Sequence, residues 1–148
     1  MLKQVYYEET NEGLIIPALT KSPTKRQLVK WAGASNDYNE VHYDKDSAIR
    51  EGFSGVIVHG RLKAAFLGQF ITDWIGMKGC LNNLSCNYRR VDYLDGHLIC
   101  NGRVTKKYVL DGKGLVQCQI WVENDIGERS VTGEAEVSLP LSSKQAKG

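Results

Sequence analysis

The sequence predicts an α+β fold in which an antiparallel sheet is wrapped around one long central helix, at about residues 59–75. In that segment large apolar residues recur every four positions, which is typical of a buried helix. After Gly76 the apolar period changes to two, which is typical of strands. Gly, Asp and Asn separate these strands, and connections this short require antiparallel pairing.

The first part of the chain predicts short elements. Residues 13–17 are compatible with one short strand. A helix is expected to begin with Ser22 as its N-cap and Pro23 as its first residue, and Gly33 is expected to end it. Asp44 is the expected cap of a second short helix. All these elements precede the long helix.

The long helix has a wide apolar face, on which the largest residues are Leu62, Phe66, Phe70 and Trp74. A helix of this kind is expected to be enclosed by other structure. Arg61 and Lys63 stand in its first turns, where cations oppose the helix dipole. For these two side chains the sequence is compatible with two environments, which are solvated surface and contact with an anion.

Four strands are expected after the helix. Residues 81–91 give the weakest pattern, and three clearer alternating segments begin near Leu98, Val116 and Val131. We find no linker, so the chain is predicted to be one domain over residues 1–148, with a disordered tail from about residue 141.

Composition excludes several classes of protein. The 148 residues carry a formal net charge of only +2, with 19 Lys and Arg spread among 17 Asp and Glu, which gives no reason to expect nucleic acid binding. Neither a secretory signal nor a membrane-length apolar run is evident, so we expect a cytoplasmic protein and no membrane partner. The four cysteines have no metal-binding spacing and are expected to be buried reduced thiols.

The candidate for chemistry is the polar loop over residues 32–44, which places Asp37 and His42 five positions apart. A carboxylate and an imidazole that converge on one water molecule can perform two proton transfers. Taken alone, Asp37 also fits an ordinary capping turn. His42 taken alone also fits a surface histidine or one that is hydrogen-bonded for structural reasons. His59 is interpreted as structural, fixing the turn before the long helix. No H-x-x-x-H or H-E-x-x-H spacing occurs, so no metal site is predicted.

Two motifs carry a family resemblance. The first reads Ala-Gly-x-Ser-x-Asp-x-Asn-x-x-His over residues 32–42, and the second reads Gly-Phe-x-Gly-Val-Ile-Val-His-Gly over residues 52–60. Followed by an apolar helix, this pattern resembles the MaoC-like hydratases and dehydratases, which are hot-dog-fold enzymes that act on acyl thioesters. At motif level the resemblance covers about residues 24–75, and the strand pattern agrees to about residue 139.

The resemblance implies a role for five residues. Asp37 and His42 match the catalytic pair of the family, and Gly60 matches the glycine whose backbone N–H faces the thioester carbonyl. Asn39 and Ser35 match positions that order the catalytic loop.

The sequence departs from the family pattern at two loop positions. Asn36 stands where the family usually has Gly, and Asn tolerates the left-handed conformation that a Gly would adopt. Glu40 stands where the family usually has Pro, and its negative charge is expected to lie near His42.

The function implied is that of a hydro-lyase, which hydrates trans-2-enoyl thioesters or dehydrates (R)-3-hydroxyacyl thioesters carried by CoA or acyl carrier protein. Arg89 and Arg90 are candidates for contact with the phosphates of the carrier. No cofactor is expected, and the family implies a homodimer, or a heterodimer with a second hot-dog subunit. The alternatives are a hot-dog acyl thioesterase and a non-catalytic partner subunit of a heteromeric dehydratase.

Overall fold

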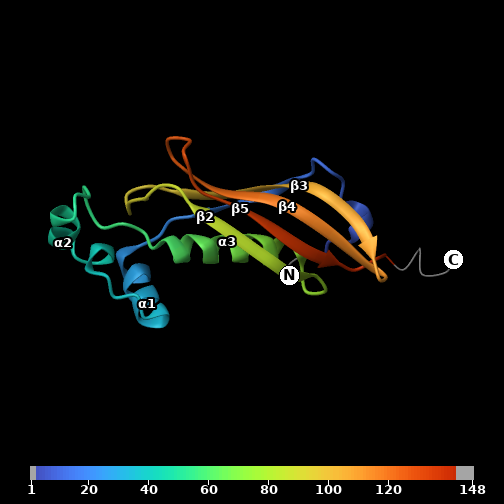
Figure 1. Ribbon diagram of the computed structural model, residues 1–148, viewed down its shortest axis with the longest axis horizontal. Coiled ribbons are helices and arrows are strands. Elements are labelled where there is room, and N and C mark those ends of the chain that lie inside the picture. Colours follow the sequence, from blue (N-terminus) through green and yellow to red (C-terminus); the bar gives the residue numbers. More distant parts are fainter. Residues whose placement is uncertain (1–2, 143–148) are drawn as a thin grey trace.

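The computed structural model describes residues 3–142 and contains one five-stranded antiparallel sheet (Figure 1). The order of strands across the sheet is β1-β3-β4-β5-β2, so β1 and β2 form its two edges. The strands are β1 (Ile15–Lys21), β2 (Cys80–Tyr88), β3 (Leu98–Leu110), β4 (Lys113–Asn124) and β5 (Arg129–Leu139).

The long helix α3 (Gly60–Ile75) lies along one face of the sheet and has contacts with all five strands (Figure 1). Its apolar residues pack against the alternate strand residues that face it, and together they form the main core. These facing strand residues include Cys100, Val104, Cys118, Ile120 and Val137. The predicted α+β hot-dog architecture, with a sheet around one central helix, is therefore confirmed.

Three shorter helices connect β1 to α3: α1 (Lys25–Ser35), the 3-10 helix η2 (Glu40–His42) and α2 (Lys45–Arg50). In Figure 1, α1 and α2 lie at one end of the molecule, beyond the first turn of α3, whereas the β3–β4 hairpin lies at the other end. A further 3-10 helix, η1 (Tyr7–Glu9), precedes β1.

The boundaries predicted for α1 were wrong at both ends. The N-cap is Thr24, whose hydroxyl oxygen accepts a hydrogen bond from the N–H of Gln27 at 3.2 Å, so the helix starts two residues after Pro23. The helix continues through Gly33, because the left-handed conformation that ends it falls on Asn36 (φ 58°). The cap predicted for α2 is correct, since Asp44 accepts hydrogen bonds from the N–H groups of Asp46 and Ser47.

The strand predictions differ from the structure at both edges of the sheet. The first strand extends to Lys21, with a register shift beside Pro17, a position at which an edge strand tolerates proline. Strand β2 ends at Tyr88, so Arg89 and Arg90 lie beyond its end and not on the strand. Ser142 still donates a backbone hydrogen bond to Glu8, and the remainder of the predicted tail, residues 143–148, lies outside the described residues.

All four cysteines are free thiols. Cys100 and Cys118 are buried in the core and Cys86 is half-buried, but Cys80 is exposed, so the prediction of burial was wrong for that residue. Within residues 3–142 no helix is long and apolar enough to cross a membrane.

Candidate active site

The loop between α1 and α2 carries Asp37 and His42, and backbone turns fix its course. The N–H of Asp37 donates to the carbonyl of Ala32 at 3.1 Å, directly after the left-handed Asn36. The side chain of Asn39 then caps η2 by accepting a hydrogen bond from the N–H of Val41 at 3.3 Å. These turns bring Asp37 and His42 to the same side of the loop.

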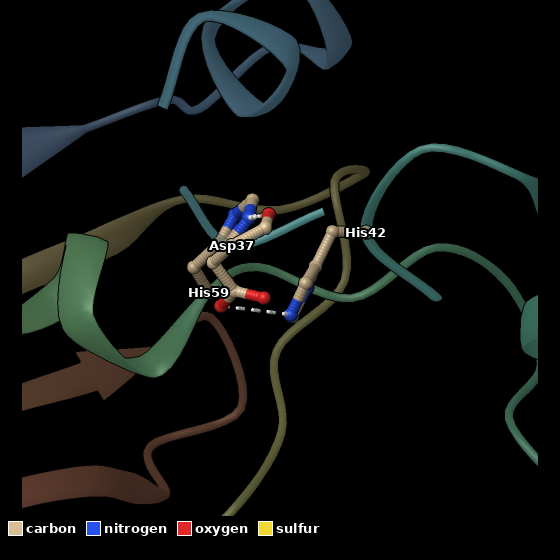
Figure 2. Close-up of side chains that lie close together, drawn as sticks. All are labelled: Asp37, His42 and His59. Carbon is tan, nitrogen blue, oxygen red and sulfur yellow. Dashed lines mark hydrogen bonds and ion pairs between the residues drawn. The ribbon is translucent and has the colours of Figure 1, made fainter. Parts of the chain in front are cut away.

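His42 is held in one tautomer. Its Nδ1 lies 2.8 Å from the carbonyl oxygen of Ile57. Because a carbonyl only accepts hydrogen bonds, Nδ1 carries the proton and Nε2 is left as the basic nitrogen. Figure 2 shows that Nε2 points toward the carboxylate of Asp37, with 3.8 Å between Nε2 and Oδ2. The imidazole is largely buried, whereas the Asp37 side chain is partly exposed.

His59 lies against His42 and is the N-cap residue of α3. The two rings are stacked, with their centroids 3.7 Å apart and their planes 19° apart (Figure 2). Nε2 of His59 is 3.5 Å from the carbonyl oxygen of Asp37, and Nδ1 is buried without a hydrogen-bond partner among the described residues. Burial, followed by the nearby His42, lowers the pKa of His59, so this ring is neutral at neutral pH.

Gly60 is the first residue of α3, so its backbone N–H has no partner within the helix. The aromatic ring of Tyr88 covers it closely: a Cβ at position 60 would lie 3.1 Å from Cδ1 of that ring. The absence of a side chain therefore lets Tyr88 approach the start of the helix. The positive end of the helix dipole is directed to the same place.

A cavity of about 400 Å³ lies beside these groups, and the residues that line it include His42, Gly60, Tyr88, Arg89 and Arg90. Both arginine side chains are exposed, and each has one weak polar contact. Nε of Arg89 is 3.4 Å from Oγ1 of Thr132, and Nε of Arg90 is 3.7 Å from a carboxylate oxygen of Glu128. A second cavity of about 470 Å³, lined mainly by apolar residues, lies near the other end of α3, beside Phe70 and Trp74. Asp37 and His42 do not line that second cavity.

Two other residues at the loop form side-chain hydrogen bonds within or toward the helices that flank it. The hydroxyl of Ser35 donates to the carbonyl of Trp31 at 2.7 Å, so this hydrogen bond stays within α1. The hypothesis that Glu40 adds a charge near His42 stays a prediction. Its carboxylate is turned toward α2, where it accepts a hydrogen bond from the hydroxyl of Ser47 at 2.7 Å.

The side chains of Asp37, His42 and His59 could be considered as metal ligands, since one ligand atom from each lies within 4.8 Å of the others. A metal ion must lie near the plane of each imidazole that binds it, about 2 Å from the nitrogen. The two rings lie face to face in nearly parallel planes, so their nitrogen lone pairs do not converge on one point. This arrangement favours acid–base chemistry over metal binding.

The ion pair between Lys63 and Asp92 was not expected from the sequence. Both side chains are buried, with 2.9 Å between Nζ and Oδ2, so Lys63 is not a solvated surface residue, and the anion that it contacts is the carboxylate of Asp92. Lys63 precedes Leu67 and Phe70 by four and seven positions, the spacing of one helix face. That spacing was the available signal for its burial.

Comparisons with known proteins show the family to which the chain belongs. The family model described as "MaoC like domain" matches residues 14–94, more than half of the chain. The chain belongs to the MaoC-like family. This MaoC-like chain is 24% identical, over 86% of its length and 95% of the relative's, to the 3-oxo-4,17-pregnadiene-20-carboxyl-CoA hydratase beta subunit of Mycobacterium tuberculosis.

Solved structures include similar MaoC-like folds. The R-hydratase PhaJ1 from Pseudomonas aeruginosa is 28% identical, with a TM-score of 0.85 over 94% of this chain and 88% of that one. A chain of the ChsH1-ChsH2 complex from Mycobacterium tuberculosis is 25% identical, with a TM-score of 0.76 over 88% of this chain and 98% of that one.

Proposed function

We propose that this MaoC-like protein is a hydro-lyase that adds water to trans-2-enoyl thioesters, or removes it from (R)-3-hydroxyacyl thioesters. The observation that carries the proposal is the pairing of a basic His42 nitrogen with the Asp37 carboxylate at 3.8 Å, beside the first turn of α3. The similarity to an R-hydratase and to a CoA-ester hydratase subunit supports the class of substrate and the R configuration.

The pair is suited to hold one water molecule. Nε2 of His42 and the Asp37 carboxylate are both hydrogen-bond acceptors, and they are too far apart to bond each other directly. A water molecule between them donates one proton to each, which turns its oxygen lone pairs toward the substrate. The oxygen then bonds to the β-carbon, one water proton passes to the pair, and the pair returns one proton to the α-carbon.

Between these steps negative charge develops on the thioester oxygen as an enolate. The N–H of Gly60 has no partner within α3, and the helix dipole adds positive potential there. Both features stabilise that oxygen in the transition state more than in the ground state. Dehydration uses the same groups in reverse, and neither direction needs a cofactor.

We further propose that the protein pairs with a second hot-dog subunit along β2. Both sheet edges contain a register shift, but β1 also carries a proline, which cannot donate a hydrogen bond to a partner strand, whereas β2 runs for nine residues without one. Tyr88, at the end of β2, lines the cavity beside His42, so a partner placed there lies next to the site. The relative named as a hydratase beta subunit supports a heteromeric assembly as the alternative to a homodimer.

The decisive experiment follows the loss of conjugated enoyl absorbance when the purified protein is mixed with crotonyl-CoA and longer trans-2-enoyl-CoAs. We expect turnover, with the chain-length preference measuring the acyl-binding space. Release of free CoA without hydration, detected with a thiol reagent, would instead establish the thioesterase alternative. A folded protein that binds enoyl-CoA but never converts it would support the non-catalytic subunit.

A further inference from the structure

The buried ion pair between Lys63 and Asp92 lies one helical turn from Gly60, and the proposed chemistry does not use it. Lys63 is 1% exposed and Asp92 is 3% exposed. Removing two charges from water costs free energy, and hydrophobic residues of similar size usually stabilise a protein at least as well. The pair therefore calls for an explanation other than stability.

The pair connects four segments of the chain. Nζ of Lys63 also donates to the carbonyl of Arg90 at 2.9 Å, which ties α3 to the connection between β2 and β3. The carbonyl of Asp92 accepts a hydrogen bond from the N–H of Val58 at 2.8 Å, in the segment that leads into α3. Its carboxylate also lies 3.4 Å from the side-chain nitrogen of Asn124, at the end of β4.

Several residues of these contacts border the cavity beside His42. Val58, Lys63, Arg89 and Arg90 all line it. The N–H groups of both arginines donate to the carbonyl of Ser130, at 2.8 and 3.2 Å. The backbone that carries the two guanidinium groups is thus held between β5 and Lys63.

We propose that Lys63 and Asp92 are positioning residues, which set Arg89 and Arg90 at the correct place to bind the phosphates of the thioester carrier. This inference rests on the proposed function and adds to it a determinant of carrier recognition. A guanidinium binds phosphate through directed hydrogen bonds. The affinity for the phosphate therefore depends on where the backbone of the arginine is held.

The test compares two substrates in a variant that leaves no buried charge unpaired. Lys63→Met with Asp92→Leu removes both charges and keeps the volume, whereas either change alone strands one charge in the core. Crotonyl-CoA carries the phosphates, and crotonyl-N-acetylcysteamine has the same reacting group without them. The control is Lys21→Met, because Lys21 also donates to a residue of α3, Gln69, but is only half-buried and does not line the cavity.

We expect kcat/KM for crotonyl-CoA to be about tenfold lower in the double variant, because KM rises. A tenfold change corresponds to the loss of one charge-assisted contact. In the double variant, kcat/KM for the truncated thioester should stay within about twofold of the wild-type value, a change no larger than ordinary surface substitutions cause. The Lys21→Met control should match the wild type on both substrates. An equal loss on both substrates in the double variant would show a merely structural role, and no loss on either would exclude positioning.

Binding of free CoA, measured by calorimetry, separates this inference from the proposed reaction. If the wild type binds CoA without turning over either thioester, the proposed reaction is wrong. A Kd about tenfold higher in the double variant would then still support the positioning role. An unchanged Kd in that variant, or no CoA binding by the wild type, would overturn the inference.

Discussion

At the scale of single residues, the proposed acid–base chemistry depends on one backbone carbonyl. The oxygen of Ile57 fixes the proton of His42 on Nδ1, so Nε2 is available as a base without any change of tautomer. Ile57 is itself held by a hydrogen bond from its N–H to the carbonyl of Val41, at 3.0 Å. The loop that carries His42 and the segment that leads into α3 therefore hold each other in place.

Replacing Asp37 with Asn should lower kcat/KM for crotonyl-CoA by about 10²–10⁴-fold, because the water loses one of its two proton acceptors. The fold should be retained, since an Asn oxygen can still accept the hydrogen bond that Asn39 N–H donates to Asp37. Enoyl absorbance and circular dichroism would check the two expectations. An Asp37→Asn protein with near wild-type turnover would remove Asp37 from the proposed mechanism.

His59 offers a second prediction, because it presents a flat, neutral ring to His42. His59→Phe keeps a ring at this position, whereas His59→Ala removes it. We expect about a tenfold loss of kcat in the alanine variant, where His42 can shift, and less than about a threefold loss in the phenylalanine variant. Equal losses in both variants would indicate that the nitrogens of His59 matter more than its stacking.

Metal removal provides a third check on the same residues. Because the stacked rings do not direct their lone pairs to one point, dialysis against a chelator should leave kcat and the unfolding midpoint unchanged. Loss of activity that added zinc restores would instead favour a metal site at Asp37, His42 and His59.

At the scale of elements, the residues that end the helices determine how the catalytic loop begins. Asn36 adopts the left-handed conformation that ends α1, one residue before Asp37. Asn36→Ala should lower the free energy of unfolding by about 1 kcal/mol, because a Cβ without a local hydrogen bond disfavours this conformation. Asn36→Gly should stay close to the wild type in both unfolding free energy and kcat/KM. Urea unfolding of the two variants checks this, and equal stability would contradict it.

The helices and strands also differ in how well the sequence predicts them. The period of apolar residues in α3, and the change of period after it, come from burial on one face and predicted both elements correctly. The start of α1 was misplaced, because Ser22 with Pro23 and Thr24 with Gln27 both fit a helix start, and the hydrogen bond that the Thr24 hydroxyl accepts from the Gln27 N–H selects the second. The contacts of Lys63 and His59 depend on partners 29 and 17 positions away, Asp92 and His42, and no local pattern specifies them.

At the scale of the whole molecule, buried titratable groups predict that stability is highest near neutral pH. The pKa of His59 is lowered by burial, so below about pH 6.5 the unfolded chain binds a proton that the folded chain resists, and stability falls. Burial raises the pKa of Cys100 and of Cys118 to about 12, from an ordinary value of 9.0. Above pH 9 the unfolded chain therefore releases protons that the folded chain retains, and stability falls again.

The fall in stability above pH 9 is the sharper test of this prediction, because two thiols contribute to it. At pH 10, one unit above their ordinary pKa, each thiol should lower the free energy of unfolding by about 1.4 kcal/mol relative to pH 7.5. Urea unfolding at both pH values measures this in the wild type and in a Cys100→Ala, Cys118→Ala variant. The variant is less stable at both pH values, because it leaves small cavities, but its loss between them should be about 3 kcal/mol smaller. Equal losses in the two proteins would mean that these thiols do not remain protonated inside the sheet–helix core.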